Sequence, residues 1–432
     1  MSPLLVPLLA QLIDLKVADR TEARYVKYDS ARYEGTTNPK ATVSVKARRL
    51  VSSLSYGPRF TLVPLDQEPR DLLVFHEAAA KLSYSLRRST LAFTSAVGYG
   101  KINFRFYGIQ GPTVGVAPGN GTTPDGSTGM PGTMQPGTST AQPGTSTPGG
   151  TGAPIPGGTG TATTQPLVVD RNLPYYTSVT ALMLTHRPLK DVELGAQGGF
   201  TSAGGLSSEA RFYYPSLRGL SLGVSAADTY HLSKRDSFKS NSSFLQTWSS
   251  NGNTSGTLMA TETWGHQFGK RTSTSLGAGL NITRFTQRDG LQGYSVFPNF
   301  QAALTHQVRL GRGTLALALM AFATPVLDPL RAIVDPRVGA GANVGYALGA
   351  FQATVTSNVA FSIAPASRNA GAVDSAQAQA LLGYQLAKAV QLDGGLRYTR
   401  QAYQGITVVP NTWAAFVGVT LGLDVRLVGS RK

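Results

Sequence analysis

The chain has 432 residues, no cysteine, and 39 Lys and Arg against 23 Asp and Glu, which gives a formal charge of +16. The lack of cysteine excludes a disulfide scaffold and any thiolate metal site. The chain has no run of eighteen apolar residues, which excludes a helical membrane span. Only 14% of residues are charged, while there are 49 Gly and 25 Pro. This composition is atypical of a cytosolic enzyme and favours an all-β protein.

The chain starts with an apolar segment, MSPLLVPLLAQ, which has no Lys or Arg before its apolar core. We expect residues 1–20 to lie outside the fold, either as the remnant of a signal peptide that has lost its basic start or as a short periplasmic stub. Residues 21–432 are expected to form a single domain.

The dominant pattern beyond this segment is a period-two alternation, which is typical of strands with one apolar face. Near the C-terminus, Val417, Leu421 and Val425 fall on one parity, whereas Gly418 and Gly422 fall on the other. The pattern predicts eighteen strands, most of them about ten to fifteen residues long, which suits a tilted crossing of a bilayer. They lie at about 22–29, 41–48, 51–63, 74–86, 90–107, 174–186, 190–201, 205–214, 218–230, 256–268, 272–286, 293–307, 313–324, 337–348, 350–364, 375–386, 389–402 and 412–427.

One segment interrupts the strand pattern. Residues 111–165 contain 15 Gly, 9 Pro and 14 Thr, repeat the string PGTST, and carry a single charge, Asp125. Such a stretch has almost nothing to bury, so we expect a long disordered extracellular loop inserted within the sheet domain. A flexible insertion is the simpler interpretation, and a plug, a surface-display element or a tether to a partner are the alternatives.

The connections between the predicted strands are sorted by length. Those after even-numbered strands are short, as at Arg87–Ser89 and Gly269–Arg271. Those after odd-numbered strands are mostly long, as at Pro64–Leu73 and His231–Ser255, with Ser202–Gly204 as the brief exception. Short connections on one side and long ones on the other are the plan of an outer-membrane barrel with short periplasmic turns and long extracellular loops.

Aromatic side chains fall near the ends of the predicted strands. Bands of aromatic rings flank the apolar surface of transmembrane barrels, because the rings favour the membrane interface. Aromatic residues that simply end core strands are the alternative interpretation. The predicted girdle comprises Tyr84, Tyr214, Phe268, Tyr346, Tyr384 and Tyr398.

Strand number, strand length, sorted connections and aromatic ends together make the chain resemble bacterial outer-membrane β-barrels of the porin-like class, over nearly all of its length outside 111–165. The resemblance implies an antiparallel, up-and-down transmembrane barrel in the outer membrane of a Gram-negative bacterium, in contact with lipid and lipopolysaccharide. The C-terminus departs from that class, since it ends in Lys432 and not in an aromatic residue.

A barrel of this size has an interior that side chains cannot fill, so we expect a water-filled channel. Parity predicts more cations than acids on its wall, which would favour anions; the alternative is that these charges pair across neighbouring strands. The predicted cations are Arg48, Arg59, Lys81, Arg87, Lys101, Arg105, Arg211, Arg337, Arg397 and Arg426. The predicted acids are Glu77, Glu193, Asp393 and Asp424.

Other chemistry has little support in the sequence. The five histidines are far apart, so no metal site and no cofactor are expected. No set of Ser, His and Asp residues is indicated that would support hydrolysis, and we predict that the protein is not an enzyme. Basic residues are dispersed, which argues against nucleic-acid binding.

The sequence therefore predicts an outer-membrane channel for polar or anionic cargo. The sharpest version resembles exopolysaccharide-secretion porins, which release a secreted polysaccharide and work with periplasmic polysaccharide-export proteins. A general solute diffusion porin is the first alternative. A non-conducting structural or surface-display barrel is the second.

Overall fold

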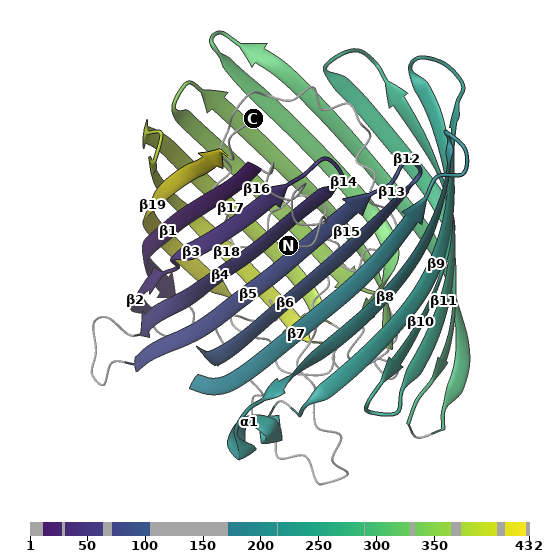
Figure 1. Cartoon of the computed structure of the whole chain (residues 1–432), viewed down its shortest axis with the longest axis horizontal. Coiled ribbons are helices and arrows are strands. Elements are labelled where there is room, and N and C mark those ends of the chain that lie inside the picture. The colour runs from purple at the N-terminus through teal and green to yellow at the C-terminus, as the bar shows by residue number, and fades with distance from the viewer. Residues whose placement is uncertain are drawn as a thin grey trace, which may run out of the picture.

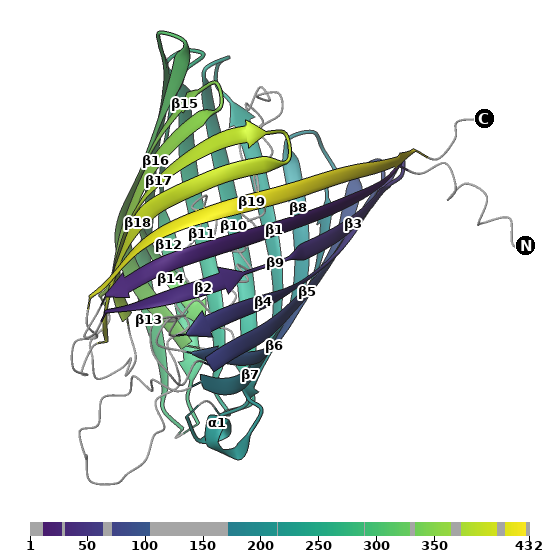
Figure 2. The same ribbon diagram turned by 90° about the vertical axis from the view of Figure 1, so that its left-hand side faces the viewer.

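The computed structural model shows one large sheet and almost no other regular structure (Figures 1 and 2). In its described part, α1 (Ser208–Tyr213) is the one helix, and no helix there is long and apolar enough to cross a membrane. The segment predicted as a loop at 111–165 lies outside the described residues. The structure describes residues 12–27, 31–63, 71–103, 172–213, 215–288, 290–328, 333–363, 373–403 and 411–428.

The sheet contains nineteen strands. They are β1 (Leu12–Lys27), β2 (Ala31–Thr37), β3 (Lys40–Lys46), β4 (Leu50–Val63), β5 (Asp71–Ser85), β6 (Ser89–Asn103), β7 (Asn172–His186), β8 (Val192–Gly205), β9 (Leu217–His231), β10 (Asp236–Ser249), β11 (Thr254–Gln267), β12 (Thr272–Thr286), β13 (Gln292–Leu310), β14 (Gly313–Asp328), β15 (Ile333–Leu348), β16 (Phe351–Ser362), β17 (Val373–Ala387), β18 (Val390–Tyr403) and β19 (Thr412–Val428).

These nineteen strands form a closed barrel with eighteen positions, because β2 and β3 share one position. Both pair with β1 on one side and with β4 on the other, and Asn38 and Pro39 separate them. Proline has no N–H to give to a ladder, so a break at this point is expected. The barrel closes where β1 pairs with β19 along its whole length, from Leu12–Val428 to Lys27–Trp413. All neighbours are antiparallel, which confirms the predicted fold class.

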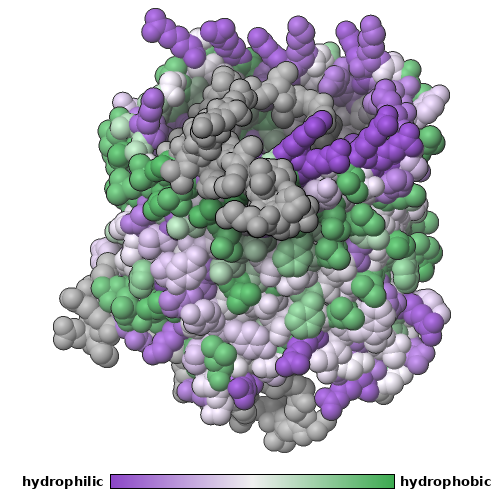
Figure 3. Space-filling view, viewed as in Figure 1, coloured by the Kyte–Doolittle hydropathy of each residue, from purple (hydrophilic) through white to green (hydrophobic). Residues whose placement is uncertain are grey.

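The two faces of the wall differ as the alternation predicts. Large apolar side chains are exposed on the outer face: Val417 is 69% exposed and Val355 is 54% exposed. Their strand neighbour Phe416 points inward and is only 5% exposed. So many exposed apolar side chains around a closed wall require a hydrocarbon environment, and Figure 3 shows hydrophobic surface over the middle of the molecule.

The predicted count of eighteen matches the number of wall positions, although one predicted strand is wrong and two strands, β2 and β10, were not predicted. Residues 205–214, predicted as a strand, form the end of β8 and a connection that contains α1. There the Ser207 hydroxyl accepts a hydrogen bond from the Ala210 amide, which favours a helical turn over a strand. Conversely, β10 lies within 231–255, which was predicted as a loop. Its outer face carries Ser240 and Ser242 between aromatic residues, so the apolar alternation is weak.

The first strand also differs from its prediction. It begins at Leu12, so residues 12–20, expected to lie outside the fold, are part of the wall. The alternation of this segment is broken on the outer face, where Asp19 and Thr21 pair with the outward residues Leu421 and Val419, so a search for apolar alternation missed the start of the strand.

The connections are sorted between two rims. All turns at one end of the barrel have two to five residues, as at 86–88 and 268–271. We call this end, which is uppermost in Figure 1, the short-turn rim. The connection with α1 lies at the opposite end, the long-loop rim. By the plan of outer-membrane barrels, the short-turn rim is the periplasmic one.

Candidate functional site

The inner wall divides into two unlike parts. Inward positions of β18, β19 and β1 to β5 hold most of the charges, and we call this part the charged wall. Inward positions of β9 to β17 hold mainly Ser, Thr, Asn, Gln and Gly, and we call this part the neutral wall. Charged side chains described there are Lys239, Arg309 and Arg337. The charged wall carries Asp14, Lys16, Arg20, Glu22, Arg24, Glu34, Lys40, Lys46, Arg59, Asp71, Glu77, Lys81, Asp393 and Arg397.

Ion pairs between strands organise the charged wall. Arg20 Nη2 lies 2.6 Å from Asp393 Oδ2 and 3.2 Å from Glu22 Oε2. Arg24 Nε lies 2.9 Å from Glu34 Oε2, and the Glu34 side chain is 1% exposed. A carboxylate buried this deeply needs such a cation, because desolvation strongly disfavours an unpaired charge.

An aromatic ring completes this network. Phe416, on β19, lies between two guanidinium groups: Arg20 is 5.9 Å and Arg397 is 5.8 Å from its ring centroid. Cations over an aromatic face are attracted by the ring quadrupole. The Nε of Arg397 has no hydrogen-bond partner among the described residues. Arg397 therefore retains hydrogen-bonding capacity that its wall neighbours do not use.

Further pairs follow along the charged wall. Arg59 Nη2 donates a hydrogen bond of 2.8 Å to Glu77 Oε1, and Lys46 Nζ lies 3.8 Å from Asp14 Oδ2. These contacts show that pairing across neighbouring strands, the alternative interpretation of the wall charges, occurs at these positions. The charged wall is thus more evenly balanced than a purely basic surface.

The structure places the predicted wall residues in several locations. The pairing register puts Arg59, Glu77, Lys81, Glu193, Arg337, Asp393 and Arg397 on inward positions. Arg48 and Arg87 lie in turns of the short-turn rim, and Arg211 lies in α1, so none of these three is on a wall strand. Asp424 and Arg426 occupy positions of β19 with inward parity. Arg105 lies outside the described residues.

The prediction for Lys101 is wrong. Its register on β6 gives it the parity of Tyr99, whose side chain is 52% exposed on the outer face. Lys101 therefore points outward at the long-loop end of the barrel. The apolar residues of 90–107 change parity near Gly98, and the prediction followed the later part of that segment.

Five members of the predicted aromatic girdle are described. Tyr84, Tyr346 and Tyr384 lie on the outer face near the short-turn rim, and Phe268 follows β11 there. Tyr398 lies near the long-loop rim, with its ring centroid 4.5 Å from that of Trp413. Tyr214 lies outside the described residues.

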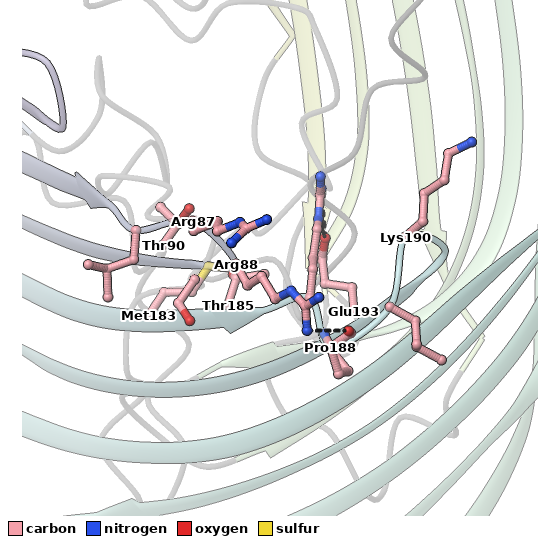
Figure 4. Close-up of a pocket in the computed structure, with 12 residues that line it drawn as sticks. Arg87, Arg88, Thr90, Met183, Thr185, Pro188, Lys190 and Glu193 are labelled. Carbon is pink, nitrogen blue, oxygen red and sulfur yellow. Dashed lines mark hydrogen bonds and ion pairs between the residues drawn. The ribbon is translucent and has the colours of Figure 1, made fainter.

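A cavity of about 630 Å³ opens at the short-turn rim. The alternation pattern does not predict this cavity. Two turns, 86–88 and 187–191, form it together with the inward residues Thr90, Met183 and Thr185 (Figure 4). We call this cavity the mouth pocket. Its charged lining consists of Arg87, Arg88, Arg187, Lys190 and Glu193.

The mouth pocket has an excess of positive charge. Arg187 is neutralised by Glu193, whose Oε2 lies 2.9 Å from both its Nε and its Nη2. Arg88 Nη1 donates to the Pro188 carbonyl oxygen over 3.2 Å, and that bond leaves its charge uncompensated. Arg87 and Lys190 are exposed. The pocket therefore suits an anion, and the Arg-Arg doublet in a short turn is the sequence signal that could have identified it.

Comparisons with known proteins agree with the fold. No known family model matches the sequence, and no curated protein does. The FrpB iron transporter from Neisseria meningitidis is similar in structure: its F3-3 variant has a TM-score of 0.52 and 9% identity, covering 94% of this chain and 66% of that one. Its F5-1 variant has a TM-score of 0.50 and 8% identity, covering 94% and 82%.

A third similar structure is the outer membrane protein OpdK from Pseudomonas aeruginosa, with a TM-score of 0.45, 11% identity and coverage of 96% and 99%. At these identities the likeness concerns the fold. The chain has the fold of outer-membrane β-barrels. Together with the apolar outer face, this fold places the protein in the outer membrane of a Gram-negative bacterium, as the resemblance implied.

The described part of the chain has no arrangement of side chains that would hold a metal. Among the described residues, no group of three His, Asp or Glu side chains could ligate a metal ion. The histidines near the short-turn rim contact their strand neighbours: His266 Nδ1 lies 2.7 Å from Asp236 Oδ1, and His306 Nδ1 lies 2.8 Å from the Thr272 hydroxyl. These contacts are those of interfacial structural residues.

Proposed function

We propose that the barrel is an outer-membrane channel for polar, anionic cargo. The mouth pocket is the observation that carries this proposal. Arg87, Arg88 and Lys190 lie at the rim, beside inward residues of β6 and β7, and the single acid of the pocket, Glu193, already pairs with Arg187. A cationic group at the entrance of a water-filled channel with low-dielectric walls concentrates anions and raises their rate of entry.

Ion selectivity in planar bilayers tests this proposal. Replacing both arginines (Arg87→Gln with Arg88→Gln) should reduce the preference for chloride over potassium, which the reversal potential in a salt gradient reports. A matched control removes two cations near the long-loop rim (Arg284→Gln with Arg288→Gln), of which Arg284 is on the outer face. The proposal fails if the barrel does not conduct, or if the two double variants change the reversal potential equally.

The finer version of this function is an exit for a secreted polysaccharide that works with periplasmic polysaccharide-export proteins. The neutral wall supports it, because hydroxyl and amide groups match the hydroxyl groups of sugars. Asn281 is 1% exposed, and its Oδ1 and Nδ2 both lack a hydrogen-bond partner in the described part of the chain; Asn358 Oδ1 lacks one too. Buried groups of this kind require water or a ligand.

A genetic experiment separates this version from a general solute porin. Deletion of the gene should abolish one surface glycan and leave the uptake of small solutes unchanged. Complementation with the Asn281→Leu variant, which removes the amide but keeps the size, should restore less glycan than complementation with the natural chain. Loss of small-solute uptake with normal glycan would instead identify a general diffusion porin.

A further inference from the structure

The turns of the short-turn rim carry basic residues well beyond the mouth pocket. These residues are exposed, and we call them the basic belt. They come from the turns β9–β10, β11–β12, β13–β14 and β17–β18. The basic belt consists of Lys234, Arg235, Lys270, Arg271, Arg312 and Lys388.

The acid that follows Arg235 in the chain is engaged by other side chains. Asp236 follows Arg235 directly, but its carboxylate accepts hydrogen bonds from Ser233 Oγ at 2.7 Å and Trp264 Nε1 at 3.3 Å, and lies 2.7 Å from His266 Nδ1. The positive charges of the belt therefore remain available to an external partner.

Each belt turn also presents an exposed apolar side chain just before its cations. Leu232, Phe268 and Leu386 are 56–58% exposed, and Leu310 is 49% exposed. An apolar side chain followed by a cation at the edge of a transmembrane wall can reach the acyl chains with one group and the lipid phosphates with the other. In Figure 3, hydrophilic side chains stand along the upper rim above hydrophobic surface.

The long-loop rim also carries exposed cations, such as Arg218, Arg284 and Arg288, but its described connections are less basic. The β10–β11 connection, 250–253, reads Ser-Asn-Gly-Asn and has no charge. The β8–β9 connection carries Glu209 with Arg211, one charge of each sign. The turns that form the basic belt are thus more basic than the described connections of the long-loop rim, while both rims border the apolar outer face.

We propose that the basic belt is a binding surface for anionic phospholipid headgroups in the leaflet that borders the short-turn rim. The belt cations would donate hydrogen bonds to phosphate oxygens while the neighbouring Leu and Phe side chains enter the acyl region. Each cation near an anionic bilayer surface changes the lipid preference by about fivefold. This role goes beyond cargo conduction and uses residues outside the mouth pocket.

The three tryptophans of the chain allow each rim to be examined separately. Trp264 lies on the outer face of β11, and its ring is connected to Phe268 through His266, with centroid separations of 5.5 Å and 4.5 Å. It therefore reports on lipid next to the belt. Trp248 and Trp413 lie on the outer face near the long-loop rim.

The experiment uses the full chain in vesicles of brominated phosphatidylcholine, which quenches tryptophan, with increasing amounts of unbrominated phosphatidylglycerol. The Trp248→Phe, Trp413→Phe variant reports on the short-turn rim, and the Trp264→Phe, Trp413→Phe variant reports on the long-loop rim. We expect phosphatidylglycerol to relieve quenching at Trp264 at least tenfold more effectively than phosphatidylcholine, and to show no such preference at Trp248.

Replacing Lys234, Arg235, Lys270 and Arg271 by Gln should reduce the preference at Trp264 to within twofold of that at Trp248, and 0.5 M salt should weaken it in the natural chain. Equal preferences at the two rims, or a preference that survives the four replacements, would overturn the proposal. So would a belt that binds a soluble acidic polymer in preference to phosphatidylglycerol vesicles. Conductance of the same four-fold variant, which retains the mouth pocket, shows that the barrel is folded and keeps this test separate from that of the channel.

Discussion

The guanidinium of Arg20 lies 2.6 Å from the carboxylate of Asp393, although 373 residues separate them in the chain. Arg20 is on β1 and Asp393 is on β18, so the pair spans β19, the strand that closes the barrel. Gly418 of β19 adjoins the pair, and a Cβ there would lie 3.3 Å from Asp393 Oδ2, so that a side chain would require a small shift of the carboxylate. The closure of the barrel is thus stabilised by an ion pair inside it as well as by the backbone ladder.

Removal of Arg20 should destabilise the barrel. Among the described residues, the Arg20→Ala variant leaves Asp393, whose side chain is 11% exposed, with a single hydrogen bond of 3.5 Å from Thr420. We expect a loss of about 2 kcal/mol in the free energy of unfolding, measured by urea titration in vesicles. The exposed Lys388→Ala variant is the control and should change it by less than about 0.5 kcal/mol. Equal effects would show that the pair does not contribute to closure.

Addition of a methyl group at Gly98 should also be destabilising. A Cβ there would lie 2.8 Å from the Phe75 ring, which covers Gly98 on the inner wall. The Gly98→Ala variant should lose about 1–3 kcal/mol of stability, because Phe75 must leave its position. At Gly345, also inward, a Cβ would meet nothing within 4 Å, so Gly345→Ala should be neutral or slightly stabilising. The same urea titration checks both; similar losses would contradict the packing of Phe75.

Arg397 and Lys101 provide a direct comparison of the two faces. The Arg397→Glu variant reverses a charge on the inner wall, so the channel should become less selective for anions. The Lys101→Glu variant reverses a charge on the outer face and should leave selectivity unchanged. Reversal potentials of both variants in the same salt gradient test this difference. A larger shift for Lys101→Glu than for Arg397→Glu would support the prediction from sequence that Lys101 lies on the channel wall.

A charged side chain on the outer face at mid-membrane should destabilise the barrel. Val355 lies near the middle of β16 and is 54% exposed, so the Val355→Arg variant should lose about 2–4 kcal/mol in vesicles. Its neighbour Thr354 points inward, and the Thr354→Arg variant should fold with a much smaller loss. Equal losses would indicate that both side chains are in the same environment.

Apolar alternation predicts a strand well where the outward side chains of that strand face lipid. The alternation identified β16 and β19 closely because residues such as Val355 and Leu421 must be apolar where they face hydrocarbon. It missed β10 because Ser240 and Ser242 replace apolar side chains on the outer face, where Ser240 Oγ donates to Glu262 Oε2 over 2.7 Å. Apolar alternation does not predict a strand where polar side chains occupy its outward positions.

The candidate site residues were harder to predict than the fold. Parity alone predicted the inward positions of Arg59, Asp393 and Arg397, which agree with the register. The mouth pocket was not found, because it joins two turns that are a hundred residues apart and no periodicity links them. The ion pairs of the charged wall also required the register, since sequence alone does not say which strand adjoins which.

The alternation of faces around a water-filled interior is the central claim of this account, and labelling of single cysteines tests it most directly. The natural chain has no cysteine, so Gln352→Cys, Ala353→Cys, Thr354→Cys and Val355→Cys variants each carry one thiol along β16. In vesicles, a membrane-impermeant maleimide should label positions 352 and 354 and leave 353 and 355 unlabelled. Labelling of neighbouring positions at equal rates, or labelling at 353 and 355 alone, would contradict the account.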